Sequence, residues 1–450
     1  MTTLAWASLR RRAAAFTATF VSVLLGTALI GSFATLIETA TGPVSSQDHD
    51  NLLIMGAVVG SWGTAIVLFS LASTIGITVR QRGVEIGLLR TIGSSPRQAR
   101  RLVRVETLLV SAVAAAGGAV LAAVGGRLLF TALRDGGVVA STVEFGGGPA
   151  SLGATALAMV ATALAAASVA GRRATRGPAR LALAEAAADR PRLPWWRFVI
   201  ALVLLGYGAA MAVVTITVTA HSDDPYDAMA TSGNSGILVS LGLAALAPVL
   251  VRWTAALAQP AAGRASTSWQ LALANARRRS HLLGGVLAPV IVFTAASVGT
   301  LMLVSIDHRS LEVPDDGTEI INLLNNVVVA MISLFAAIMV LNAWAATVAH
   351  RRTELARLWL LGATPTQVRG SVVAEATFVA VIGVALGFIA SLVTVVPFAV
   401  ARDEGIVPDG QLWLAPALMA AAVAITLGAA AVAVRRVTVR PAAILAGAAQ

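Results

Sequence analysis

The sequence predicts an all-α polytopic membrane protein with about ten transmembrane helices and no large extracytoplasmic domain. Hydrophobic residues make up 57% of its 450 residues and charged residues only 12%, a composition that no soluble fold requires. Apolar runs long enough to cross a bilayer recur along the chain, separated by short polar loops. One basic stretch between two such runs occurs twice, 269 residues apart, which indicates an internal duplication.

Four predicted spans form a first unit, residues 1–180. They cover residues 13–37, 52–79, 105–133 and 149–171. The arginines before the first run resemble a signal peptide, but a run of about 25 apolar residues is long enough to span, so we expect an uncleaved helix. A polar, acidic loop at residues 38–51 and a Gly-rich loop at residues 134–148 connect spans on the outer side.

An arginine-rich linker with three prolines, residues 171–197, marks the boundary of the first unit. Residues 181–269 contain this linker's end and two middle spans, 196–220 and 236–257, joined by an acidic loop at residues 221–235. Residues 270–450 form a second unit, which starts with the amphipathic segment 271–279. Its four predicted spans cover residues 282–306, 321–349, 371–400 and 411–434.

The arginines predict the orientation. The sequence has no lysine, and when the repeated stretch is placed in the cytoplasm, 29 of the 33 arginines lie on that side or at its edge. By the positive-inside rule, both termini are expected in the cytoplasm and the protein in the cell membrane. The net charge of +11 is therefore explained by topology, and nucleic acid is not an expected partner.

The repeated stretch comprises residues 80–106 and 350–375. In the first copy, Glu85, Leu89 and Ile92 fall at helical spacing, which predicts a short amphipathic helix. Gly93 is expected to end this helix, because glycine readily adopts a left-handed conformation. Ser95, Pro96 and Gln98 then predict a new helix that opens with a capping box, and Thr364, Pro365 and Gln367 repeat that device.

The shared pattern E-x-x-x-L-x-x-x-G-x-[ST]-P-x-Q-x-R, with one span before it and two after it, resembles the FtsX-like permease domain of MacB-type ABC systems. The resemblance covers residues 1–180 and 270–445. It implies a non-catalytic permease subunit that docks one ATP-binding subunit under each copy, with ATP and Mg²⁺ bound by that partner and no cofactor or metal bound by this chain. The docking residues that it implies are Glu85, Leu89, Gly93, Pro96, Glu354, Leu358, Gly362 and Pro365.

The resemblance also implies a substrate class, export or outer-leaflet handling of an amphipathic or peptide-like molecule. Family members usually carry a large extracytoplasmic domain, which this sequence lacks. A cargo-free module that transmits force or signals to a cell-envelope partner remains an alternative, as does an ion-driven secondary transporter. The transporter would need ionisable residues inside the spans, and Glu106 and Glu375 at span edges are nearly the only candidates. For both carboxylates we favour structural pairing with a nearby arginine.

Other motifs favour structural interpretations. The chain has no cysteine, no lysine for a standard P-loop and no clustered histidines, so thiol, Walker A and zinc sites are not expected. The segment 233–236, GNSG, matches a rhomboid-protease motif but lacks a histidine in a neighbouring span. Gly56-x-x-x-Gly60 and Gly383-x-x-x-Gly387 predict close helix packing. Arg97, Arg100, Arg101 and Arg104 are consistent with contacts to lipid head groups or to the ATPase.

Overall fold

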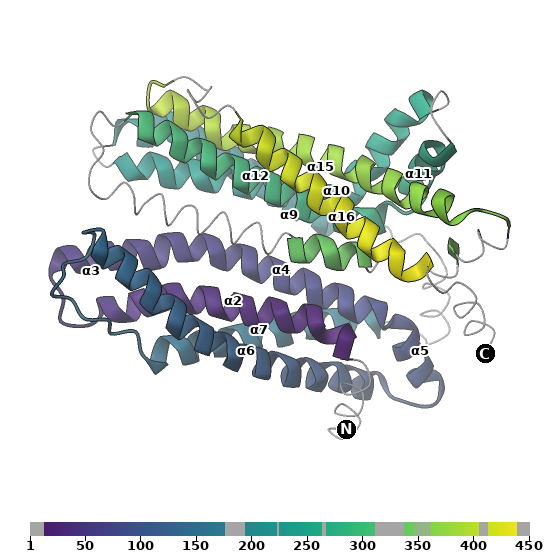
Figure 1. The fold of residues 1–450 in the computed structure, drawn as a ribbon, viewed down its shortest axis with the longest axis horizontal. Coiled ribbons are helices and arrows are strands. Elements are labelled where there is room, and N and C mark those ends of the chain that lie inside the picture. Colours follow the sequence, from purple (N-terminus) through teal and green to yellow (C-terminus); the bar gives the residue numbers. More distant parts are fainter. Residues whose placement is uncertain are drawn as a thin grey trace. The chain divides into compact units, whose positions relative to one another are not determined.

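The computed structural model describes residues 13–175, 194–222, 225–262, 267–310, 337–345, 347–348, 351, 354–355, 358, 361–404 and 413–438. Within these ranges the chain is helical and contains no strand, as the sequence predicts. The described residues form two compact units, one made of residues 13–175 and the other of the described residues from 194 onward (Figure 1).

The first unit is a bundle around α2. Its elements are α2 (Ala13–Ala40), α3 (Ser46–Leu53), the π-helical segment η1 (Ile54–Val59), α4 (Gly60–Gln81), α5 (Gly83–Thr91), α6 (Pro96–Asp135) and α7 (Pro149–Ala174). α2 packs against α4, α6 and α7, and α6 also packs against α7 (Figure 1). The short helix α5 therefore lies between the end of α4 and the start of the long helix α6.

The second unit is a bundle around α12. Its elements are α9 (Trp195–Thr217), η2 (Thr219–His221), α10 (Pro225–Ala262), α11 (Thr267–Arg278), α12 (Ser280–Ser310), α15 (Pro365–Ala401) and α16 (Leu414–Thr438). α12 packs against α10, α15 and α16, and most of its residues are buried. The two middle spans, α9 and α10, pack against each other and against α15, so they belong to this unit.

Eight helices among the described residues are long and apolar enough to cross a membrane. They are Phe16–Ala40, Pro96–Asp135, Pro149–Ala174, Trp195–His221, Asp227–Pro260, Ser280–Asp307, Pro365–Ala401 and Ala415–Arg435. Of the two remaining predicted spans, residues 52–79 correspond to the end of α3, η1 and α4. The other, residues 321–349, lies mostly outside the described residues.

Two loops predicted on the outer side are shorter than expected. The predicted loop 38–51 is wrong over residues 38–40, which are the end of α2, and over residues 46–51, which belong to α3. Ser45 caps α3, and its Oγ accepts a hydrogen bond from the Asp48 N–H (3.1 Å). The predicted loop 221–235 is wrong from Pro225 onward, where α10 begins. Proline at a helix start has the required φ and no N–H to satisfy.

Small residues set the helix crossings in both bundles. A Cβ at Gly118 of α6 would lie 2.5 Å from the Leu24 carbonyl oxygen and 2.7 Å from Thr27 Cβ in α2. A Cβ at Gly387 of α15, 269 residues later, would meet the Ile291 carbonyl oxygen of α12 at 2.8 Å. Such distances allow only glycine, because they bring backbone against backbone. The predicted packing role of Gly383 and Gly387 is thereby confirmed; Gly56 and Gly60 similarly contact Phe33 of α2.

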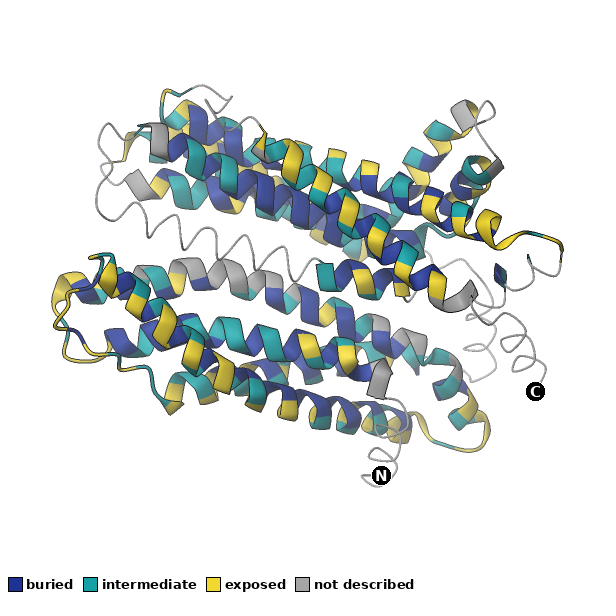
Figure 2. Cartoon of the chain, viewed as in Figure 1, coloured by how far each residue is buried: buried dark blue, intermediate teal, exposed yellow. Residues whose placement is uncertain are grey.

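Burial follows these crossings. Figure 2 shows buried residues on the helix faces that meet inside each bundle and exposed residues on the outward faces. Exposed leucines and valines on the spans are expected where a helix faces lipid. The outward face of α9 is an example, with Phe198, Leu202 and Val203 all exposed.

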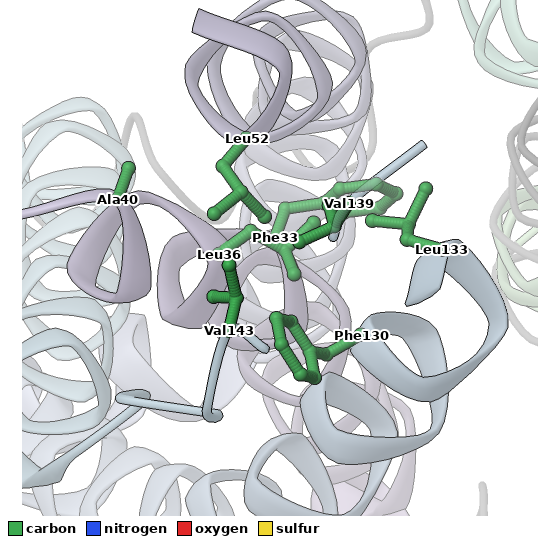
Figure 3. Packing of buried hydrophobic residues seen from close by; sticks show 8 residues of the cluster. All are labelled: Phe33, Leu36, Ala40, Leu52, Phe130, Leu133, Val139 and Val143. Carbon is green, nitrogen blue, oxygen red and sulfur yellow. The ribbon is translucent and has the colours of Figure 1, made fainter. Parts of the chain in front are cut away.

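The end of the first unit remote from α5 is closed by an apolar cluster (Figure 3). It consists of Phe33, Leu36 and Ala40 of α2, Leu52 of α3, Phe130 and Leu133 of α6, and Val139 and Val143 of the following loop. Polar bonds hold this loop in place. Glu38 accepts hydrogen bonds from the N–H groups of Gly148 and Ser151 (3.0 and 2.9 Å), and Asp48 accepts one from Ala140 (2.9 Å).

Candidate functional site: two glycine turns and their buried ion pairs

The first glycine turn joins α5 to α6. Gly93 adopts φ +103°, its N–H donates to the Arg90 carbonyl (3.2 Å), and the Ser94 N–H donates to the Leu89 carbonyl (3.0 Å). These two bonds form a Schellman motif, which satisfies carbonyls that the end of a helix leaves unpaired. In the second copy Gly362 has φ +90° and the Ala363 N–H donates to the Leu358 carbonyl (3.0 Å). The sequence prediction that Gly93 ends the first short helix is confirmed.

Each turn is followed at once by a capping box. The Ser95 hydroxyl accepts the Gln98 N–H (3.3 Å), and the Gln98 side chain accepts the Ser95 N–H (2.8 Å). Thr364 and Gln367 make the same two bonds, at 3.3 and 2.9 Å. Pro96 and Pro365 occupy the first helical positions. Both predicted capping boxes are confirmed, and they fix the direction in which α6 and α15 leave the turn.

Replacing Gly93 or Gly362 with alanine is expected to destabilise the turn by about 1–2 kcal/mol, because a side chain disfavours the left-handed conformation. The loss would come from the backbone alone, since no atom lies within 4 Å of a Cβ at either position. Gly83→Ala is the matched control: its Cβ position is equally open, but its φ is not positive. Amide hydrogen exchange at residues 89–95 would measure the opening of the turn. Equal protection in G83A and G93A would contradict the prediction.

A buried ion pair ties the first turn to its span. Arg82, which precedes α5, donates through Nη1 and Nη2 (3.2 Å) to the carboxylate of Glu106 in α6, whose side chain is 0% exposed. Arg82 Nε also lies 3.4 Å from Glu85. Arg82 and Glu106 are 24 residues apart, and their bond therefore fastens the start of the short helix to the third turn of the long one.

The second copy builds the same pair and extends it. Arg351 Nη1 donates to Glu375 (2.6 Å), and Arg351 Nε lies 3.5 Å from Glu354. Glu375 accepts a further hydrogen bond from Asn275 of α11 (2.8 Å), and Glu354 forms an ion pair with Arg279. α11, the amphipathic segment before the first span of the unit, and Arg279, which follows it, are thus linked to the second ion pair.

Each central arginine is held in its charged form. Burial by itself lowers the pKa of Arg82, but the hydrogen bond and the charge of Glu106 outweigh it, and the pKa is raised above the ordinary value. At Arg351, burial likewise lowers the pKa, but the charge of Glu375 outweighs this effect, and the pKa is raised above the ordinary value. The favoured structural pairing of Glu106 and Glu375 with arginines is confirmed. Both partners had a sequence signal, because Arg82 and Arg351 occupy equivalent positions of the repeat.

The predicted docking residues differ in how far they are exposed. Gly93, Pro96, Gly362 and Pro365 are exposed, whereas Leu89 and Leu358 are half-buried and Glu85 and Glu354 are engaged with the arginines. The most exposed apolar side chains at the turns are instead Ile92 (75%) and Leu361 (84%), which are equivalent positions of the two copies. Sequence reasoning placed Ile92 on the apolar stripe but did not single out this pair.

The GNSG segment has a structural role. Ser235 is buried in α10, and its hydroxyl lies 2.6 Å from the Ser232 carbonyl and 2.9 Å from the Val393 carbonyl of α15. Ser232 also donates to the Thr394 carbonyl (2.5 Å). These bonds fasten a middle span to α15, and they engage the hydroxyl that a protease would use as its nucleophile.

Comparison with known proteins gives one result. A family model described as FtsX-like permease C-terminal matches residues 57–179 and 326–441, together more than half of the chain. Each matched segment contains one of the two glycine turns described above, together with its capping box and its buried carboxylate. No curated protein matches the chain.

Proposed function

Because this chain belongs to the FtsX-like permease family, we propose that it is the membrane component of an ABC transporter, driven by ATP hydrolysis on a separate subunit. The partner supplies the ATP site and its Mg²⁺. This chain supplies the spans and the surface on which the partner docks.

The observation that carries the proposal is the exposed apolar residue at each glycine turn, Ile92 and Leu361. A large apolar side chain exposed at a capped turn is typical of a residue that enters a pocket of a partner. Glu85 and Glu354, both partly exposed, precede these residues in the sequence and add a polar group near each arginine of the ion pairs. The proposed docking surface also includes the exposed positions that the sequence pattern indicates, Gly93, Pro96, Gly362 and Pro365.

The buried ion pairs supply the coupling. A push on the turn acts on α5, and Arg82 transmits it directly to Glu106 inside α6. In the second copy, Arg351 connects the turn to Glu375 in α15. Because a buried pair is costly to break, the short helix and the span move together.

The finer features of the proposal rest on the repeat and on the arginines. Two equivalent turns favour two ATPase subunits per chain and an origin by duplication, as in MacB-type systems. The arginine distribution favours an orientation with both turns and both termini in the cytoplasm and the protein in the cell membrane. Two four-span units plus two middle spans, with short outer loops, favour export or outer-leaflet handling of an amphipathic or peptide-like substrate.

The test is capture of an ATP-binding protein from gently solubilised native membranes. We expect Ile92→Asp/Leu361→Asp to lower its recovery at least tenfold, about the effect of losing one interface hot spot. Trp413→Asp is the control, because it places the same charge on an apolar residue that is 67% exposed at the start of α16. If wild type captures no ATP-binding protein, or the double variant captures as much as W413D, the proposal fails.

A further inference from the structure

The lateral face of the first unit carries a groove between α6 and α7. It has a volume of about 450 Å³ and is lined by Arg101, Arg104, Val105 and Leu108 of α6 and by Leu164, Ala165 and Ser168 of α7. No acidic side chain is among its lining residues. The groove therefore combines two cationic groups with an apolar bed.

Both arginines of the groove are available to a ligand. Arg101 and Arg104 lie one helical turn apart and are exposed, and neither guanidinium has an ion pair or hydrogen bond within the described part of the chain. This distinguishes them from Arg100, whose Nε donates to the Pro96 carbonyl (3.1 Å), and from Arg82, which is committed to Glu106. Two unpaired guanidinium groups on one face favour a phosphate, which accepts hydrogen bonds from both.

The order of the lining residues along α6 indicates what the rest of the ligand is. Leu108 lies seven residues beyond Arg101, or about 10 Å along the helix. The arginines come before the apolar part of α6, whereas Val105 and Leu108 begin it and are exposed or half-buried on the bundle surface. A ligand that fills the groove must therefore be anionic at the membrane surface and apolar a few ångströms deeper.

The second copy lacks the charges. Shifting Arg101 and Arg104 by 269 residues gives Gly370 and Val373 on α15. Arg100, by contrast, is matched by Arg369. Positions needed in both copies for docking or topology retain their residue types, as Glu85, Gly93, Pro96 and Glu106 do. The pair Arg101 and Arg104 therefore serves a function that only the first unit has.

We propose that the groove between α6 and α7 is a binding site for one anionic glycerophospholipid, with its phosphate between Arg101 and Arg104 and its acyl chains along Val105, Leu108 and Leu164. Basic pockets between membrane helices at the cytoplasmic surface have this chemistry. Ser168 adds a hydroxyl donor at the groove wall. The site requires only insertion of the chain in a bilayer, and it holds whether or not an ATPase docks at the turns.

The test is native mass spectrometry of the full-length protein in detergent, titrated with phosphatidylglycerol or phosphatidylcholine. Wild type should bind one phosphatidylglycerol more tightly than any phosphatidylcholine. Arg101→Gln/Arg104→Gln should weaken that first binding step about thirty-fold, from the contributions of two arginines at an anionic surface. Arg97→Gln/Arg278→Gln, which removes two exposed arginines outside the groove, should leave it within about threefold.

Two further measurements identify the ligand. Excess inorganic phosphate should not displace the bound phosphatidylglycerol, because the acyl chains contribute through the apolar bed. Displacement by phosphate would show an anion site without lipid selectivity and would overturn the proposal. Equal phosphatidylglycerol binding by wild type and R101Q/R104Q would also overturn it, and loss of ATPase capture in that variant with lipid binding intact would assign the arginines to the protein partner. Both arginines are exposed, so the variant is expected to keep its helical content.

Discussion

Arg82→Met is expected to destabilise the first unit by about 3–5 kcal/mol, the loss typical of breaking a buried ion pair from one side. The variant would leave the Glu106 carboxylate fully buried, and the structure gives that carboxylate no other hydrogen-bond partner among its described residues. Replacing both partners, in Arg82→Met/Glu106→Met, should restore most of the stability, because an apolar pair leaves no uncompensated charge.

The second copy provides the internal comparison. In Arg351→Met, Glu375 keeps its hydrogen bond from Asn275 (2.8 Å), so the loss should be smaller than in Arg82→Met. Unfolding in mixed micelles with increasing SDS would measure both variants. A double variant as unstable as R82M, or an R351M loss equal to that of R82M, would show that these bonds do not determine the energetics of the pair.

Gly118→Leu is expected to cost about 3 kcal/mol, the upper end of the range for overpacking. The new Cβ would lie 2.5 Å from the Leu24 carbonyl oxygen, and a backbone atom in the centre of α2 cannot move aside as a flexible side chain can. The crossing of α2 and α6 would have to widen, which removes contacts along both helices. Gly387→Leu should act similarly on α12 and α15, where the Ile291 carbonyl oxygen lies 2.8 Å from the Cβ position.

Gly153→Leu is the control for this experiment. Gly153 lies in α7, is exposed, and has no atom within 4 Å of its Cβ position, so leucine there should be neutral or slightly stabilising. Unfolding midpoints in SDS would separate the three variants. A Gly118→Leu variant as stable as Gly153→Leu would mean that the helices can separate at this point without loss.

The features that could be predicted from the sequence are those determined within a few residues. The capping boxes at Ser95 and Thr364 and the turn at Gly93 depend on local hydrogen bonds and on one φ angle, and the structure confirms them. The apolar runs also predicted eight of the helices that can span a membrane, because hydrocarbon thickness determines their length.

What the sequence did not reveal depends on contacts between distant segments. That Asn275 would bond to Glu375, 100 residues away, follows from the packing of α11 against α15 and has no local signal. The groove at Arg101 and Arg104 depends likewise on which face of α7 packs against α6. The starts of α3 and α10 were missed for another reason: acidic, polar residues such as Asp48 and Asp227 were interpreted as loop, although they also favour the first turn of a helix.

The length of α6 has a mechanical consequence. It runs without a proline after its first residue, and its 40 residues extend about 60 Å. The contact at Gly118 can serve as a fulcrum, with arms of about 33 Å toward Pro96 and about 26 Å toward Asp135. A tilt of about 5° around it would displace the two ends by roughly 3 and 2 Å in opposite directions. A straight, uninterrupted α6 that tilts about this contact therefore moves its two ends in opposite directions.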